Sequence, residues 1–162
     1  LFVFKSINLG SSNDKNKTSL TSWIEESVDK KESDMILQMD IEGSEHEVLI
    51  ETSIETLLRF RTLIIEFHSL NNLFDEFNLK VMTAIFNKLK TNFSIAHCHP
   101  NNCCGIAVVD DISIPRVLEL TFIRNDRIKN AVSKKPFSLP HVLDCKNVDK
   151  NPDLMMPEVW WK

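Results

Sequence analysis

Short apolar runs alternate with longer amphipathic segments along the chain, and this alternation predicts strands separated by helices. Residues 35–39 form an apolar run between Asp34 and Asp40, which suits a strand buried on both faces of a parallel sheet. Residues 62–68 form a similar run that ends on charged groups, and residues 78–92 carry one apolar side at helical spacing. We also predict strands at residues 1–9, 93–98 and 117–123, and short helices at residues 20–28 and 54–58.

The segment after residue 39 identifies the first of these runs as a strand. Gly43 allows a tight turn, and Ser44 with Glu47 has the spacing of a capping box that opens a helix. The order is then strand, acidic turn and helix, and ligands of open α/β sheets bind at such a turn. Asp40 and Glu42 lie on it. A structural interpretation stays open for Glu45 and Glu47, which could serve only to complement the helix dipole.

Strands that alternate with helices predict βαβ units and a mainly parallel sheet. No convincing helix separates the last two predicted strands, so we expect them to pair antiparallel at one edge. The helix at residues 20–28 begins either at Ser19 or at Ser22, whose capping-box partner would be Glu25.

The chain is predicted to divide into one domain and a tail. Residues 1–125 carry all of the predicted strands and helices, whereas residues 126–162 are polar and dotted with proline. We expect this tail to pack on the domain in an extended form. Trp160 and Trp161 would dock it rather than bind sugar.

Composition narrows the classes of protein to which the chain can belong. Its 162 residues are enough for one domain with a core, and a net charge of -4 without a basic patch argues against nucleic acid as a partner. No apolar run is long enough to span a bilayer. The four cysteines include the adjacent Cys103 and Cys104, a poor basis for disulfides, so we predict reduced thiols and a cytoplasmic protein. The chain opens on Leu1 rather than Met, and we expect it to be part of something longer.

Four sequence blocks then occur in a recognisable order. They are residues 37–45 (LQMDIEGSE), 64–68 (IIEFH), 97–103 (HCHPNNC) and 114–124, with Ile-Pro followed by ELTFIR. Together they resemble the FkbM family of S-adenosylmethionine-dependent methyltransferases. Residues 139–144 and 157–161 also resemble the end of one bacterial branch, so the resemblance covers nearly the whole chain.

The resemblance implies an α/β fold of the class I methyltransferase type, a Rossmann-like, mainly parallel sheet with an antiparallel edge strand. Residues 35–39 would be its fourth strand and residues 63–67 its fifth. It also implies S-adenosylmethionine as cofactor and O-methylation of a hydroxyl on a sugar, glycan or related small molecule.

The chain departs from the family pattern in its cofactor loop. Class I methyltransferases cradle the cofactor with a glycine-rich turn after the first strand, yet this sequence contains only Gly10, Gly43 and Gly105. The N-terminal strands are therefore expected to be missing. The chain is either a fragment of the enzyme or a non-catalytic truncated module that offers an interaction or substrate-binding surface.

Two chemistries fit the ends of the fourth and fifth strands. Asp40 and Glu66 supply the oxygen ligands that Mg²⁺ prefers, and such an ion would acidify a substrate hydroxyl. Alternatively His68 is the general base that accepts the hydroxyl proton, with Asp40 orienting the substrate. A structural alternative is that Glu66 and His68 pair with each other or with the helix cap.

A second polar group surrounds residues 97–104. His97 and His99 project from the same face of a strand, and the nearby Cys103 and Cys104 raise the question of zinc. Their spacing matches no common zinc site. We favour substrate binding by His99, Asn101 and Asn102 at the mouth of the crevice, together with Glu42.

Overall fold

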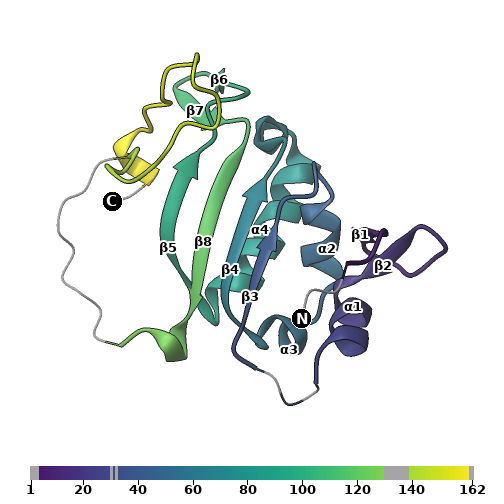
Figure 1. Ribbon diagram of the computed structural model, residues 1–162. Helices are drawn as coiled ribbons and strands as arrows, with labels where there is room; N and C mark the ends of the chain where they lie inside the picture. Colours follow the sequence, from purple (N-terminus) through teal and green to yellow (C-terminus); the bar gives the residue numbers. More distant parts are fainter. Residues whose placement is uncertain (1–3, 30, 32, 130–138, 161–162) are drawn as a thin grey trace.

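The computed structural model describes residues 4–29, 31, 33–129 and 139–160. Its centre is a four-stranded sheet in the order β3-β4-β8-β5 (Figure 1). The bounds are Met35–Met39 for β3, Phe60–Phe67 for β4, Leu118–Arg124 for β8 and Phe93–Pro100 for β5. Each predicted core strand is therefore present, within a few residues of its predicted ends.

Strand directions confirm part of the predicted topology and correct the rest. β3 and β4 pair in parallel, and β5 pairs antiparallel with β8, as predicted for the last two strands. However, β8 also pairs antiparallel with β4, so the reversed strand lies inside the sheet and β5 forms the edge. Only one of the three pairings is parallel, which makes the described sheet mixed rather than mainly parallel. The chain between β5 and β8 contains a hairpin and no crossover helix, so β8 returns antiparallel beside β5.

Two small ladders flank this sheet. β1 (Asn8–Gly10) pairs in parallel with β2 (Lys17–Ser19), and β6 (Ile106–Val109) forms a hairpin with β7 (Ile112–Pro115). The strand predicted at residues 1–9 is thus much shorter than expected. Residues 1–3 lie outside the described part, and Phe4 is exposed without a strand partner.

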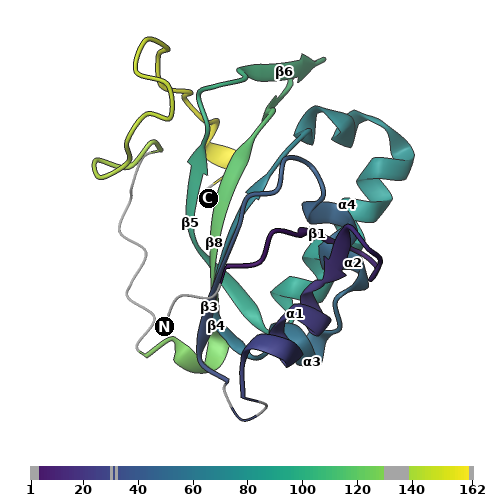
Figure 2. The same ribbon diagram turned by 45° about the vertical axis from the view of Figure 1, so that its right-hand side comes forward.

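The helices all cover one face of the sheet (Figure 2). Their bounds are Leu20–Ser27 for α1, Glu45–Glu51 for α2, Ile54–Leu57 for α3 and Glu76–Lys90 for α4. Three 3₁₀ turns, η1 (Leu70–Phe74), η2 (Asn125–Arg127) and η3 (Glu158–Trp160), complete the list. Ser19 caps α1 by accepting from the Ser22 amide, which decides between the two predicted caps, and Ser53 caps α3 in the same way.

Most of the core lies between the sheet and these helices. Alternate residues of the two central strands point into it, and the buried positions are Leu63, Ile65 and Phe67 of β4, with Leu118, Leu120 and Phe122 of β8. Met82, Ile85 and Leu89 of α4 are buried in the same cluster, as the amphipathic pattern predicted. The remaining strand positions form what we call the second face. At the carboxyl end of β4 this face carries Glu66, Glu119 and His99 side by side in register.

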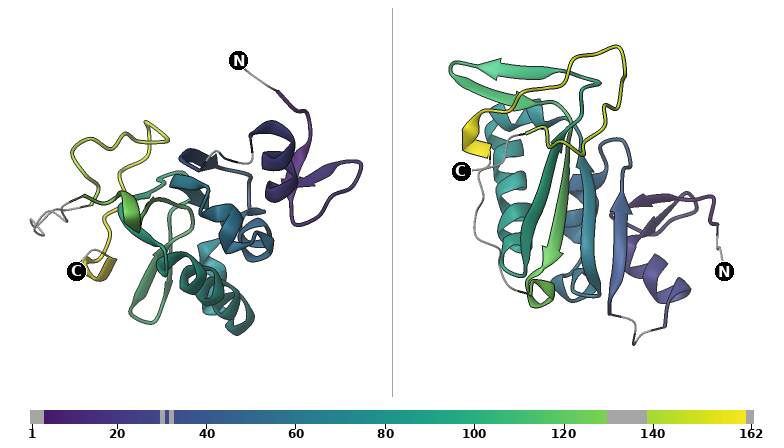
Figure 3. Two further views of the ribbon diagram at one scale, coloured as in Figure 1. Left: turned by 90° about the horizontal axis from the view of Figure 1, so that it is seen from below. Right: turned by 60° about the vertical axis from the view of Figure 1, so that its left-hand side comes forward.

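The tail lies against β5 on the side away from the helices (Figures 2 and 3). Leu139 and Met156 are buried in the core cluster, and Trp160 packs against it, so one of the two predicted tryptophan anchors is in place. Trp161 lies outside the described residues. The Leu139–Pro140 peptide bond is cis.

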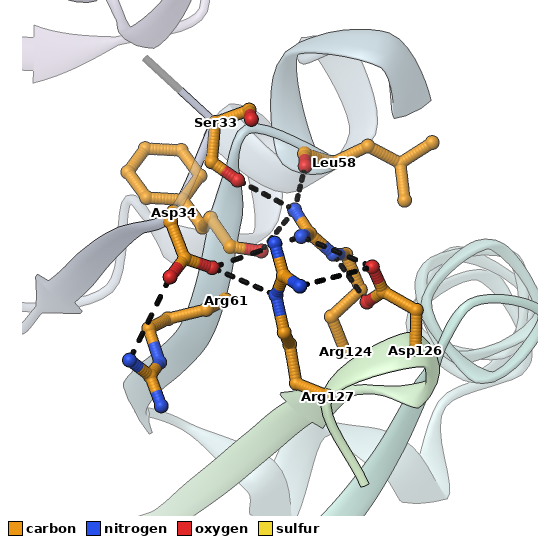
Figure 4. A network of polar contacts seen from close by, with 8 residues as sticks. Ser33, Asp34, Leu58, Arg61, Arg124, Asp126 and Arg127 are labelled. Atoms are coloured by element: carbon orange, nitrogen blue, oxygen red, sulfur yellow. Dashed lines mark hydrogen bonds and ion pairs between the residues drawn. The ribbon is translucent and has the colours of Figure 1, made fainter.

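At the opposite end of the sheet from the acidic turn, Arg124 joins separate segments (Figure 4). This buried side chain donates to the carbonyl oxygens of Ser33, Leu58 and Phe60, and its guanidinium also pairs with Asp126. Arg127 pairs with Asp34 at 2.8 Å in the same network. The segment before β3 and the start of β4 are thereby tied to the end of β8.

The cysteines differ from the prediction of four reduced thiols. Cys103 and Cys104 form a disulfide between neighbours in sequence, whereas Cys98 and Cys145 are free. Burial raises the pKa of the Cys98 thiol to about 12, with a smaller contribution from Asp144. Cys98 is therefore an inert core residue.

Candidate functional site

The candidate site forms where β3 and β4 end side by side. Asp40 follows β3 directly, and His68 follows β4. Because these neighbouring strands run in parallel, their carboxyl ends meet at one edge of the sheet and bring the two side chains together. The imidazole Nε2 of His68 lies 3.8 Å from Asp40 Oδ1 and 3.6 Å from Glu42 Oε2.

The turn between β3 and α2 is closed by Glu45 and not by the predicted capping box. Ser44 makes no side-chain capping bond. The Glu45 carboxylate instead folds back over the turn, where Oε1 accepts from the Ile41 amide at 2.9 Å and Oε2 from the Gly43 amide at 3.0 Å. Gly43 has φ of +106° and Glu42 has φ of +56°, so two consecutive residues take left-handed backbone conformations.

Glu45 also contacts the candidate base. Its fully buried side chain places Oε1 3.1 Å from Nδ1 of His68. His68 therefore has one ring nitrogen against a buried carboxylate, and the other faces two exposed ones, since the side chains of Asp40 and Glu42 are 50% and 88% exposed. Glu47, the other residue of the predicted cap, lies outside this cluster and contacts Ser11 and Lys17.

Glu66 extends the cluster onto the second face. Its Oε1 accepts a hydrogen bond from the Asn101 side-chain amide at 2.6 Å. Burial raises the pKa of the Glu66 carboxyl, and the neighbouring Asp40 carboxylate adds to the rise, while Asn101 and His68 oppose it. The structure thus brings Asp40 and Glu66 together, as predicted.

One group of side chains in the described residues has the spacing of a metal site. Asp40, Glu45 and His68 offer ligand atoms that lie within 4.8 Å of one another. The predicted magnesium pair was Asp40 with Glu66, and Glu66 does not belong to this group. A metal here would use Asp40 together with a carboxylate that the sequence did not indicate.

The residues predicted to bind substrate lie in three places. Glu42 and Asn101 belong to the cluster around His68 and Glu66. His99 lies on the second face, opposite Glu119 in register. Asn102 is buried and directs its side-chain amide to the tail, where it donates to the carbonyls of Val148 and Asn151. Its side-chain amide is therefore hydrogen-bonded to the tail.

The zinc hypothesis gains no support from the described residues. His97 Nε2 lies 2.8 Å from Oδ1 of Asp144 in the tail. Cys103 and Cys104 are joined to each other, and no metal-like group in the described ranges contains His97 or His99.

A cavity of about 570 Å³ adjoins the acidic turn on the free side of β3. Its apolar lining includes Trp23 of α1 with Leu37 and Met39 of β3. Asp40 and Glu42 also line it, so the carboxylates near His68 border the cavity. Sequence reasoning found neither the cavity nor the role of Glu45. The sequence signal for Glu45 was its position two residues after Gly43, from which its carboxylate can reach back to the amides of the turn. The capping-box spacing of Ser44 and Glu47 drew attention away from it.

In the described part of the chain, no helix has both the length and the apolar character needed to cross a bilayer.

Comparison with known proteins identifies the family. No curated protein and no solved structure matches the chain. A family model described as the methyltransferase FkbM domain matches residues 6–95, more than half of the 162 residues. The matched region runs from β1 into β5 and includes the acidic turn, Glu66 and His68. The chain belongs to the FkbM methyltransferase family.

Proposed function

We propose that this chain takes part in transfer of a methyl group from S-adenosylmethionine to a hydroxyl, with His68 as the group that accepts the hydroxyl proton. The observation that carries the proposal is the position of His68, between buried Glu45 and exposed Asp40, within the region that matches the family. An imidazole with one nitrogen 3.1 Å from a buried carboxylate and the other at 3.6 to 3.8 Å from exposed ones suits general-base chemistry near neutral pH.

The cavity beside β3 suits the cofactor in size and chemistry. Ligand cavities commonly enclose about 300–1,000 Å³, and this one has about 570 Å³. The indole of Trp23 offers a flat apolar surface for an adenine ring, and the carboxylates of Asp40 and Glu42 suit ribose hydroxyls and positive charge. When bound, the cofactor supplies an electrophilic methyl group. The glycine-rich turn is absent from this sequence, so we expect the affinity of the cavity for the cofactor to be weak.

The chain's own residues would then act on the acceptor. Glu45 fixes His68 from one side, and Nε2 of His68 takes the proton from the acceptor hydroxyl. Asp40 orients that hydroxyl from the end of β3. Glu66, Glu119 and His99 line the adjoining second face with hydrogen-bonding groups, which suits a polyhydroxylated acceptor such as a sugar or glycan.

The potential metal-ligand group of Asp40, Glu45 and His68 offers a second way to activate the hydroxyl. Asp40 and His68 could hold a divalent ion that acidifies the acceptor directly. Titration with Mn²⁺ separates the two routes, because a bound paramagnetic ion broadens the NMR signals of nearby His68 and Asp40. Site-specific broadening at micromolar Mn²⁺ would favour the ion, and its absence would favour His68 as the base.

The alternative from another class is a non-catalytic module. These 162 residues contain no glycine-rich turn of the kind that brings backbone close to a cofactor, so the chain is tested for activity directly. The deciding experiment incubates the chain with S-adenosylmethionine labelled in the methyl group and a panel of neutral sugars and glycans. Label in an acceptor that is lost in His68→Ala supports the enzyme. If no label is transferred at saturating cofactor, the non-catalytic module is the better explanation.

A further inference from the structure

The inference concerns Glu45, which is fully buried although it is a carboxylate. No lysine or arginine among the described residues forms an ion pair with it. Its charge is instead compensated by the amides of Ile41 and Gly43 and by the ring of His68. A buried carboxylate is tolerated when it is hydrogen-bonded in this way. Three contacts therefore fix Glu45, and only one of them leads to a side chain.

That one contact determines which nitrogen of His68 carries hydrogen. An ionised carboxylate only accepts hydrogen bonds, so Nδ1 of His68 must be the donor to Glu45 Oε1. In a neutral imidazole one nitrogen donates and the other accepts. Nε2 is then left with its lone pair, on the side that faces Asp40 and Glu42 at distances too long for direct hydrogen bonds.

We infer that Glu45 is a positioning residue, which holds His68 in the Nδ1–H tautomer and directs the Nε2 lone pair toward the acceptor hydroxyl. This inference rests on the proposed function for its catalytic meaning. It also assigns Glu45 a role other than metal ligand, because both of its oxygens already accept backbone hydrogen bonds. A carboxylate in this relation to a catalytic histidine controls both the tautomer and the orientation of the ring.

The first test is the tautomer itself, which needs neither cofactor nor acceptor. Long-range ¹H–¹⁵N spectra of the imidazole rings are recorded above the ordinary histidine pKa range, and a His68→Asn variant assigns the His68 signals. We expect Nδ1 to resonate as a protonated nitrogen and Nε2 as an unprotonated one. A spectrum with Nε2 protonated overturns the inference, whatever the activity of the chain.

The second test links the tautomer to activity. In Glu45→Gln a single carbonyl oxygen must replace two carboxylate oxygens, so the contact to His68 and the contacts to the turn compete. We expect a mixture of tautomers and a loss of methyl transfer of about 10²-fold or more, as for other orienting carboxylates. The matched control is Glu47→Gln on the same helix, which contacts Ser11 and Lys17 and should change neither readout.

The outcomes separate the inference from the proposed function. If Glu45→Gln folds and shifts the tautomer without slowing transfer, the positioning role is wrong. If the wild type shows the Nδ1–H tautomer but no acceptor is ever methylated, the proposed function fails while the control of His68 by Glu45 stands. Should Glu45→Gln fail to fold, the wild-type spectrum still tests the tautomer.

Discussion

The side chain of Asn102 and the backbone of Val148 exchange two hydrogen bonds. Asn102 Nδ2 donates to the Val148 carbonyl at 3.0 Å, and the Val148 amide donates to Asn102 Oδ1 at 2.9 Å. Asn151 adds a bond to the Asn102 carbonyl at 2.9 Å. Asn102, just after β5, thus binds the tail through a pair of hydrogen bonds like those between neighbouring strands.

Release of the tail should follow from Asn102→Ala. The substitution removes three hydrogen bonds made by its side chain, and it leaves the half-buried Val148 and Asn151 of the tail without them. We expect limited proteolysis to cut within residues 141–155 much faster than in the wild type. The exposed Asn147→Ala serves as the control and should leave the cleavage rate unchanged. Equal cleavage of both variants would show that the buried Leu139 and Met156 hold the tail without Asn102.

The His68 site should be sensitive to loss of the ring. Removal of a general base typically costs about 10²–10⁴-fold in rate, so His68→Ala should lose most methyl transfer. Asp40→Asn should also lose most of its activity while its thermal midpoint stays close to that of the wild type, because Asp40 is half exposed. His141→Ala, a histidine of the tail, is the control. Parallel loss of stability and activity would instead indicate a structural pair.

The turn after β3 should depend on glycine for conformational reasons. A Cβ on Gly43 would meet nothing within 4 Å, so the cost of Gly43→Ala comes from its φ of +106° alone. We expect a loss of about 1 kcal/mol or more in the free energy of unfolding, measured in urea. Gly105 has φ of +72°, close to the left-handed region that asparagine tolerates, so Gly105→Asn should cost less than Gly43→Asn. A Gly43→Ala midpoint equal to wild type would contradict this.

Glu66 should make the stability of the fold depend on pH. Burial raises the pKa of its carboxyl, so the folded state binds this proton more tightly than the unfolded state does. The stabilisation is complete below the ordinary glutamate pKa and is lost as pH rises through the raised one. Glu66→Gln keeps an oxygen for Asn101 and removes the charge. In Glu66→Gln the free energy of unfolding should therefore not fall as pH rises through this range. In Glu119→Gln, on the neighbouring strand, the fall should remain.

Lys88 should stabilise the end of α2. Its ammonium donates to the carbonyls of Leu49, Ile50 and Thr52 at 2.8 to 2.9 Å, where the helix leaves oxygens unpaired. Lys88→Met keeps the apolar stem and removes the donors, and we expect a loss of about 1–3 kcal/mol in unfolding free energy. Lys90 lies on α4 like Lys88 but is exposed, so Lys90→Met should change the free energy of unfolding little. Equal effects of the two substitutions would argue against a capping role.

Local patterns predicted the elements that depend on near neighbours. The apolar runs at residues 35–39 and 62–68 were sufficient to predict two strands. The expected burial of the first strand on both faces was wrong, because Leu37 and Met39 are buried whereas Ile36 is exposed. Ser53 was predicted as the cap of α3 because a cap depends on a near neighbour, here the amide of Thr56. The position of β8 inside the sheet was missed, since the order of strands depends on pairings between distant segments and leaves no mark in local periodicity.

The site was predicted in outline and missed in detail. Asp40 and His68 follow from the rule that parallel strands end together, and the structure brings them together. Glu45 was overlooked because Ser44 and Glu47 have the spacing of a capping box, and sequence cannot tell which carboxylate will turn back over Gly43. Asn102 was predicted to contact substrate at the mouth of the crevice, and that role stays a prediction. Asn102 is buried by a tail whose path no local pattern reveals.

The position of β8 also constrains the order of events during synthesis. In the described sheet β5 pairs with β8 alone, and β5 is synthesised before β8. As the chain leaves the ribosome, residues 93–100 must wait for residues 118–124 before they can pair, whereas β3, β4 and the helices can already pack. Until β8 emerges, the edge of β4 and the edge of β5 that it will join therefore stay unpaired, and β8 closes both at once.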